Sequence, residues 1–253
     1  MPEKLSAIVI TLNEENNLGA CLRSLAFADE IVVADCGSTD RTVEIATELG
    51  ARVVSGKWTG FGPFKRWAAE QASHDWILSL DADETITPEL QASIISALNH
   101  PEHGAWLLPR RNRFMGRWLR HGEGYPDWCL RLFDRRRAQW SDDAVHEKVL
   151  TDATPGKLKG DLLHQSEQGI ADYLAKQNRY TSLQAERLAA AGKRPGLGKM
   201  LLSPPLRFIK FYFLRLGFLD GLPGLVHISI GCFNSFIKYV KTRELLRPDH
   251  KNS

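Results

Sequence analysis

The chain has 253 residues and a mass of 28.5 kDa, which suits one large domain, alone or with an appendage. Hydrophobic residues make up 43% and charged residues 25% of the sequence, so a disordered or fibrous protein is excluded. Lys and Arg number 33 and Asp and Glu 30, for a net charge of +3. This excess is too small to indicate a nucleic-acid-binding protein. The sequence leaves the oligomeric state open.

The cysteines and the hydropathy pattern indicate a cytoplasmic protein. The four cysteines lie far apart and form no CxxC pair, which argues against a zinc ribbon and suits a reducing compartment. The N-terminus leads directly into an apolar segment, without the pattern of a secretory signal. The stretch 221–237 lacks Lys, Arg, Asp and Glu over 17 residues, but a membrane span needs roughly 20 predominantly apolar residues. A simple transmembrane helix is therefore not expected.

The first hundred residues alternate strand and helix patterns. Short apolar runs predict strands at 6–10, 30–34, 51–54 and 75–80, and helical spacing of apolar residues predicts helices between them. Ser38 or Thr39 is the expected N-cap of the second helix, and Thr87 with Pro88 is expected to open the helix after the fourth strand. This alternation predicts an α/β fold with a mostly parallel sheet covered by helices.

The pattern changes after residue 100. Residues 104–163 combine short strand patterns with many arginines and aromatic residues, which predicts an antiparallel extension with functional loops. A long helix is expected over 167–191, followed by two apolar helical segments over 201–246. We therefore expect one domain over 1–165, with halves 1–100 and 101–165, and a helical region over 166–253.

Polar, acidic clusters directly follow three of the predicted strands. They are Thr11-Leu12-Asn13-Glu14-Glu15, Asp35-Cys36-Gly37-Ser38-Thr39-Asp40 and Asp81-Ala82-Asp83-Glu84. Each cluster alone could serve only to cap a helix. In an open parallel sheet, however, ligands bind beyond the carboxyl ends of the strands. Three such clusters at successive strand ends therefore favour a ligand site.

The third cluster predicts a divalent cation site. Asp81 and Asp83 form an Asp-x-Asp pair directly after a buried strand. Mg²⁺ and Mn²⁺ prefer carboxylate oxygens, and proteins commonly share them with substrate phosphates. A cation held there would neutralise a diphosphate leaving group.

The three turns resemble those of family 2 inverting glycosyltransferases with the GT-A fold. The later segments Arg131-Leu-Phe133 and Val145-His-Glu-Lys-Val149 resemble one branch, the lipopolysaccharide-core β-glucosyltransferases. The general resemblance covers residues 5–100, and the branch-level match extends to residue 245. The resemblance implies a GT-A Rossmann-like sheet with an antiparallel extension and a helical appendage. It also implies transfer of a sugar from a nucleotide-sugar donor, UDP-glucose in this branch.

The resemblance implies a role for each residue of the strand-end clusters. The nucleotide-sugar would be bound by a set of polar and flanking residues: Thr11, Leu12, Asn13, Glu15, Asp35, Ser38, Asp40, Lys65 and Asp81. Asp83 would hold the metal with Asp81, and His164 is the candidate third ligand. Lys65 lies where the family often has a basic residue, but the family's frequent Arg-Asn pair before that helix is absent, and a solvated helix residue is the alternative.

An inverting transfer needs a carboxylate that deprotonates the acceptor hydroxyl. Glu147, in the Val-His-Glu segment, is the preferred general base, and Asp127 is the alternative. Asp142 and Asp143 are more typical of a turn. His146 could support the metal or the phosphate, or could be a packed histidine.

Residues 110–137 contain nine arginines and only three acidic residues. Because Arg binds phosphate with two parallel hydrogen bonds, this stretch predicts an acceptor site for a phosphate-decorated glycolipid, with Arg110, Arg113 and Arg131 as candidates. A solvated face with internal salt bridges is the alternative. The stretch contains no recognised nucleic-acid-binding module.

The segment 201–219 is amphipathic, with Arg207, Lys210 and Arg215 among aromatic residues and leucines. Such a segment is typical of a helix that lies on an anionic membrane surface, although packing on the catalytic domain or on a dimer partner would give the same pattern. We expect a peripheral protein on the cytoplasmic face of the inner membrane.

Together these features predict a metal-dependent inverting glycosyltransferase that moves glucose from UDP-glucose onto a lipopolysaccharide inner-core or related glycolipid acceptor. Two alternatives remain at this level. One is a nucleotidyltransferase acting on sugar phosphates, although that class usually has a glycine-rich basic loop after the first strand. The other is a non-catalytic membrane-associated scaffold, which the intact Asp81 and Asp83 argue against. The donor sugar, the acceptor and the choice of Mg²⁺ or Mn²⁺ are not fixed by the sequence.

Overall fold

The computed structural model describes residues 3–143, 147–165 and 169–247, and the chain forms two compact units. The first, here called the sheet unit, comprises Met1–Arg111 and Asp127–Gln165. The second, the helical unit, comprises Asn112–Pro126 and Ser166–Ser253. Residues 112–126 thus group with the C-terminal helices, although the sequence placed them in the first domain.

The sheet unit has a parallel half and an antiparallel half, in the order β3-β2-β1-β4-β8-β6-β12-β5. The strands of the parallel half are β1 Leu5–Thr11, β2 Glu30–Asp35, β3 Arg52–Ser55 and β4 Trp76–Asp81. The others in the path are β5 Glu84–Ile86, β6 Ala105–Phe114, β8 Asp127–Asp134 and β12 Leu162–His164. Two short strands, β7 Arg117–Trp118 and β11 Gly156–Lys157, pair with β6. The predicted α/β fold with an antiparallel extension is confirmed.

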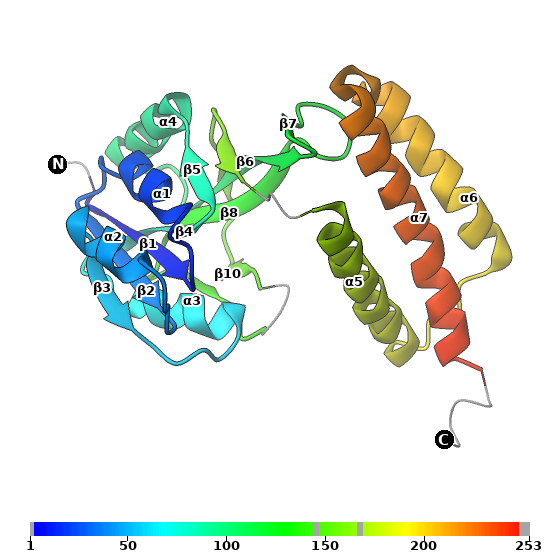
Figure 1. Cartoon of the computed structure of the whole chain (residues 1–253), viewed down its shortest axis with the longest axis horizontal. Helices are drawn as coiled ribbons and strands as arrows, with labels where there is room; N and C mark the ends of the chain where they lie inside the picture. The colour runs from blue at the N-terminus through cyan, green and yellow to red at the C-terminus, as the bar shows by residue number, and fades with distance from the viewer. Residues whose placement is uncertain (1–2, 144–146, 166–168, 248–253) are drawn as a thin grey trace. The chain divides into compact units, whose positions relative to one another are not determined.

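Helices cover the sheet because successive residues of each strand face opposite sides. On β1, Leu5, Ala7 and Val9 join a core with α1 Leu18–Ser24, α2 Thr42–Glu48 and α4 Pro88–Asn99. Ile8 and Ile10 face the other side, where α3 Phe61–Glu70 and the short β9 Ala138–Trp140 and β10 Val149–Thr151 pack. Figure 1 shows these helices around the strands.

The predicted helix starts differ in accuracy. Thr87 caps α4 by accepting a hydrogen bond from the Leu90 N–H, and Pro88 stands in the first turn, as expected. The prediction that Ser38 or Thr39 caps the second helix was wrong. The α2 helix begins at Thr42, and Ser38 instead donates its hydroxyl to Asp35, because this turn is organised around the strand end and not around the helix.

The described part of the helical unit contains the long helices α5 Ile170–Ala190, α6 Leu197–Phe208 and α7 Gly221–Leu245. A π-helical turn, η1 Ile209–Leu214, continues α6, and a short 3-10 turn, η2 Gly217–Asp220, leads into α7. The α7 helix packs against both α5 and α6 (Figure 1).

Residues 112–126 belong to this unit because a buried carboxylate binds them. Asp220 is 1% exposed and accepts hydrogen bonds from the backbone N–H groups of Arg120 at 2.9 Å and His121 at 2.8 Å. Arg117 also donates to the Leu219 carbonyl. Such long-range pairings are invisible in the local sequence pattern.

None of the described helices is by itself long and apolar enough to cross a membrane. The segments Leu197–Leu214 and Gly217–Leu245 meet the length and hydropathy criteria only as a pair, with a bend of 74° between them.

Candidate active site

The carboxyl ends of β1, β2 and β4 lie side by side because the three strands are parallel and adjacent. Thr11 pairs with Asp35 across β1 and β2, and Ile10 pairs with Asp81 across β1 and β4. The clusters predicted to converge therefore do so at one edge of the sheet unit.

The loops after β1 and β2 are joined by hydrogen bonds between their polar side chains. The Asn13 side-chain oxygen accepts from the Thr39 N–H at 2.8 Å, and the Asn13 N–H donates to the Ser38 hydroxyl at 2.9 Å. Asp40 accepts from the Glu15 N–H at 3.1 Å. These side chains therefore hold the two loops together, in addition to lying at this edge of the sheet.

Asp35 is buried, and its carboxylate accepts hydrogen bonds from the N–H groups of Gly37 at 2.9 Å and Ser38 at 3.0 Å. Gly37 has a φ of 111°, a conformation that only glycine adopts readily. Thr11 is also buried, whereas Leu12 is half exposed. The loop therefore fixes the direction of the Asp35 carboxylate.

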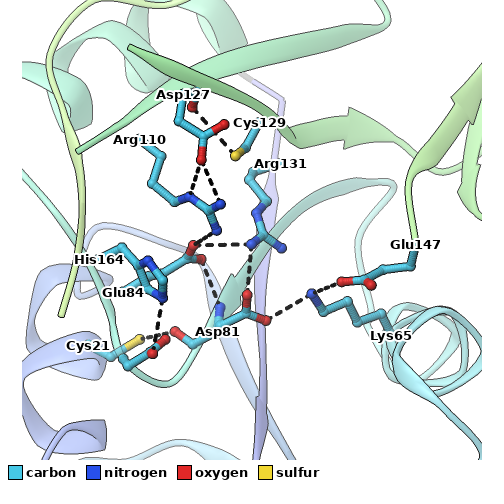
Figure 2. A network of polar contacts seen from close by, with 11 residues as sticks. Cys21, Lys65, Asp81, Glu84, Arg110, Asp127, Cys129, Arg131, Glu147 and His164 are labelled. Atoms are coloured by element: carbon cyan, nitrogen blue, oxygen red, sulfur yellow. Dashed lines mark hydrogen bonds and ion pairs between the residues drawn. The ribbon is translucent and has the colours of Figure 1, made fainter. Parts of the chain in front are cut away.

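An unbroken chain of alternating acidic and basic side chains crosses the middle of the site. It runs through seven residues, as Figure 2 shows: Glu147, Lys65, Asp81, Arg131, Glu84, Arg110 and Asp127. Four acidic and three basic groups alternate, so each cation lies between two carboxylates. The chain connects elements far apart in the sequence.

Asp81, the first acid of the Asp-x-Asp pair, is held by two cations. Its carboxylate lies 2.7 Å from the Arg131 Nη2 and 2.9 Å from the Lys65 Nζ. Burial alone would raise the pKa of Asp81, but the charges of Arg131 and Lys65 outweigh it and hold that pKa well below its usual range. Asp81 is therefore a fixed anion.

Among the residues that the structure describes, Lys65 is the most deeply buried cation, with 1% of its side chain exposed. Its Nζ contacts Glu147 at 2.8 Å and lies 4.8 Å from the centre of the Trp140 ring. A buried ammonium needs such partners, because an isolated charge in the interior is very costly. Glu147, the preferred base candidate, is thereby attached to the edge of the sheet where Asp81 lies.

Glu84 occupies the centre of the chain and is fully buried. Its carboxylate accepts from the Asp81 N–H at 3.0 Å and contacts Arg131 at 3.1 Å and Arg110 at 3.3 Å. Arg110 in turn holds Asp127, the alternative base candidate, through its Nε at 3.0 Å and Nη2 at 2.7 Å. Nearby, burial raises the pKa of the Cys129 thiol to about 11 against the opposing charge of Arg110.

Asp83 stands beside this chain and pairs with a histidine. Its Oδ2 lies 3.2 Å from the His164 Nε2. The two residues meet because Glu84 on β5 and His164 on β12 are paired in register. Burial, and then the negative charges of Asp83, Asp40 and Asp81, raise the pKa of the neighbouring Glu14. The edge therefore carries excess negative charge where a cation would bind.

Side chains in the described part of the chain do not by themselves form a complete metal site. Among the described residues, no group of three or more His, Cys, Asp or Glu side chains is placed to hold a metal ion. The Asp83–His164 pair supplies two potential ligands, and Mg²⁺ is commonly bound through one or two carboxylates together with substrate phosphates. The residues present thus fit a cation that is shared with a diphosphate.

The predicted acceptor residues lie on two strands, with Arg110 and Arg113 on β6 and Arg131 on β8. Arg110 and Arg131 lie in the ion chain of the sheet unit, whereas Arg113 belongs to the helical unit. Arg131 is almost fully buried, so it faces protein carboxylates and not the surface. His146 lies outside the described residues.

The sequence arguments missed Glu84, and the signal for it was present. It is the last acid of the Asp81-Ala-Asp-Glu84 turn, in which only the two aspartates were predicted to have a role of their own. Glu84 comes three residues after the end of the buried strand β4 and begins β5, in which Glu84 and Ile86 face the interior and Thr85 between them is only partly buried.

Known proteins resemble this chain over most of its length. The model of the family described as Glycosyl transferase family 2 matches residues 6–151. The lipopolysaccharide core biosynthesis glycosyltransferase LpsC of Rhizobium meliloti is 32% identical over 94% of this chain and 91% of its own length. An uncharacterized glycosyltransferase of Rickettsia typhi is 30% identical over 96% of this chain and 88% of its own.

Among solved structures, glucosyl-3-phosphoglycerate synthase from Mycobacterium tuberculosis, crystallised with Mn²⁺, UDP and glucosyl-3-phosphoglycerate, overlaps in part. The match covers 44% of each chain, at 27% identity and a TM-score of 0.38.

Proposed function

The chain belongs to glycosyl transferase family 2, and we propose that it transfers glucose from UDP-glucose, with inversion, to a lipopolysaccharide inner-core acceptor. The observation that supports this proposal is the ion chain of Figure 2, which contains Asp81 and the two candidate bases, together with the Asp83–His164 pair beside it. Membership of this family favours glycosyl transfer over nucleotidyl transfer and over a non-catalytic scaffold. The glycolipid acceptor is supported by the similarity to LpsC, and the donor by the branch-level motifs.

Donor binding is assigned to the loops after β1, β2 and β4. Thr11, Leu12 and Asn13 line the first loop. Asp35, oriented by its own turn, accepts a hydrogen bond from the base or the ribose. The second group, which supports these loops or contacts the donor, is Glu15, Ser38, Asp40, Lys65 and Asp81.

Asp83 and His164 are proposed to hold Mg²⁺ or Mn²⁺ together with the donor diphosphate. Asp81, which the sequence also suggested as a ligand, is engaged by Arg131 and Lys65, so we assign it to the donor ribose. When bound, the metal would neutralise the diphosphate as it leaves. With a contact of 3.2 Å between the His164 Nε2 and the Asp83 Oδ2, the two proposed ligands lie close together.

The general base is proposed to be Glu147, with Asp127 as the alternative. Both carboxylates end the ion chain and keep part of their side chain exposed, 18% for Glu147 and 40% for Asp127. Partial exposure is needed, because the base must reach a hydroxyl of an incoming acceptor. Arg110 and Arg113 remain candidates for contacts to acceptor phosphates. Arg131, the third acceptor candidate, is proposed instead to orient Asp81.

The helical unit is proposed to bind an anionic membrane surface, on the cytoplasmic side where a nucleotide-sugar is available. The α6 and η1 segments, all of which the structure describes, contain no buried residue. Their exposed apolar side chains are Leu197, Leu201, Leu202, Leu206, Ile209, Phe213 and Leu214. Several large exposed apolar side chains on one segment are typical of an interaction site, and the stretch between Lys193 and Leu219 has no Asp or Glu.

The basic residues of this segment already have partners within the protein, which favours the apolar side chains as the main groups that contact the membrane. Arg207 is ion-paired with Glu123, and Arg215 donates to the Tyr125 carbonyl at 3.0 Å. Lys210 lies over the Phe211 ring, 5.3 Å from its centre. Head-group attraction by these three residues is therefore reduced, and insertion of the leucines would supply most of the binding.

A panel of nucleotide sugars tests the proposed function. UDP-glucose should raise the thermal midpoint in the presence of Mg²⁺ or Mn²⁺ more than other nucleotide sugars do. It should then support sugar transfer to de-acylated inner-core oligosaccharide. If only another nucleotide sugar raises the thermal midpoint, the sugar of that donor replaces glucose in the proposal. Transfer of a nucleotidyl group to a sugar phosphate would refute the proposal.

A further inference from the structure

The carboxylate of Glu84 has no direct role in the transfer described above, although it lies at the centre of the site. Its side chain is 0% exposed. One oxygen accepts from the Asp81 N–H at 3.0 Å, and the other contacts both Arg131 and Arg110. A carboxylate closed off in this way has no access to a donor or acceptor, so it acts only on its neighbours.

Each neighbour of Glu84 controls a candidate functional carboxylate (Figure 2). The Nη2 atom of Arg131 that contacts Glu84 also contacts Asp81 at 2.7 Å. Glu84 therefore fixes Asp81 twice, through its backbone N–H and through Arg131. Arg110 uses its Nη1 for Glu84 and its Nε and Nη2 for Asp127, so Glu84 also fixes the direction from which Asp127 is held.

We propose that Glu84 is a positioning residue, which sets the Asp81 and Asp127 carboxylates at a fixed distance from each other in the active site. Without its charge, two largely buried guanidinium groups lose their shared anion and turn toward Asp81 and Asp127. Shifts of about 1 Å in such groups can lower turnover by about 10²-fold. This inference rests on the proposed function, because turnover here means sugar transfer.

The replacement Glu84→Gln tests the proposal because it keeps the size of the side chain and removes its charge. Glu30→Gln is the matched control, since Glu30 is also a largely buried sheet carboxylate that binds an arginine, Arg52, and two serines. We expect kcat of Glu84→Gln to fall about 10²-fold while the Kd for UDP changes less than about tenfold. The control should lose stability but keep its kcat. A kcat for Glu84→Gln close to that of the control would overturn the proposal.

A second variant covers the case in which Glu84→Gln does not fold. Arg131→Lys keeps the charge but loses the planar group that binds two carboxylates at once, and its kcat should fall at least about tenfold, with a smaller loss of UDP affinity because Asp81 is assigned to the ribose. Wild-type kcat in this variant would overturn the positioning role.

Failure of the proposed function can be distinguished from failure of this inference. If the wild type transfers no sugar from any nucleotide sugar, the proposed function is wrong. Crystal structures of the wild type, Glu84→Gln and Arg131→Lys then decide the positioning role directly. Displacement of Asp81 or Asp127 by about 1 Å or more in the variants supports it, and unchanged carboxylates refute it.

Discussion

Replacing Lys65 with methionine should cost more stability than replacing a typical surface lysine. The Lys65 side chain is 1% exposed and contacts Asp81 at 2.9 Å and Glu147 at 2.8 Å. Removing one partner of a buried ion pair costs about 3–5 kcal/mol, because an unpaired charge stays behind. Asp81 keeps Arg131, and both carboxylates have some access to water, so we expect about 3 kcal/mol, the low end of that range.

Urea unfolding followed by tryptophan fluorescence measures this loss, since Trp140 lies beside Lys65. Arg41→Met is the control, because Arg41 and Glu44 form an exposed pair and such pairs contribute at most about 1 kcal/mol. The double variant Lys65→Met/Glu147→Gln completes a thermodynamic cycle, with an expected coupling of about 1–3 kcal/mol. A Lys65→Met loss no larger than that of Arg41→Met would contradict the buried ion chain.

The pH dependence of the same loss has a defined sign. Asp81 has a pKa that is lowered in the folded protein, so its ion pairs stabilise the protein above the unfolded value of 3.8 and are lost as the pH falls further. Without Lys65 the pKa of Asp81 should rise. The stability difference between wild type and Lys65→Met is therefore expected to be full at neutral pH and to shrink in acid.

Four further predictions concern the site, the membrane and the sheet. Asp83→Ala should abolish transfer and leave the unfolding midpoint unchanged, because it removes a metal ligand. Excess EDTA should abolish transfer by the wild type. If activity is retained in either experiment, the mechanism does not use the metal. Glu147→Gln should lower kcat by about 10²–10⁴-fold with UDP binding retained, whereas a dead Asp127→Asn beside an active Glu147→Gln would assign the base to Asp127. Replacing Leu201, Leu202 and Leu206 with serine should abolish flotation with anionic liposomes but not transfer to a soluble acceptor. Leu150→Ser on the sheet unit is the control and should still float. If the triple variant floats like the wild type, or if the wild type is a dimer in light scattering and the triple variant is not, these leucines pack against protein and not against a membrane. Burial would raise the pKa of Glu30, but hydrogen bonds from Ser6, Ser73 and Arg52 lower it to about 2. The free energy of unfolding of the wild type should therefore fall as the pH decreases from about 4.5 to 2. In Glu30→Gln this free energy should depend less on pH over the same range.

The position of the site was predictable because it depends on local patterns. Asp35, Asp81 and Asp83 each follow an apolar run, and adjacent parallel strands place their carboxyl ends together. His164 was a candidate third metal ligand only through the family resemblance, and its contact with Asp83 was not predicted. Which strands are neighbours in the antiparallel half was not predictable, because it depends on pairings across 50 or more residues, such as Leu78 with Leu132.

That pairing explains why the role of Arg131 differs from the sequence prediction. In the sequence Arg131 is one of nine arginines in a basic stretch, and such stretches are usually solvated. The register of β8 on β4 instead places Arg131 beside Asp81. The alternative weighed for this stretch, internal salt bridges, therefore describes Arg131 and Arg110.

The burial of Lys65, by contrast, could have been inferred. Phe64, Lys65 and Ala68 are spaced so that they share one face of α3, and all three are buried. A lysine on the apolar face of a helix requires a carboxylate within reach, and α3 packs against β1 and β4, which end at the acidic edge. Asp81 is thus the expected partner. The second partner, Glu147, comes from 82 residues further along the chain, and only its three-dimensional path brings it there. The spacing that buries Lys65 therefore indicates that its charge serves the site, because a residue needed only for packing would not be a lysine.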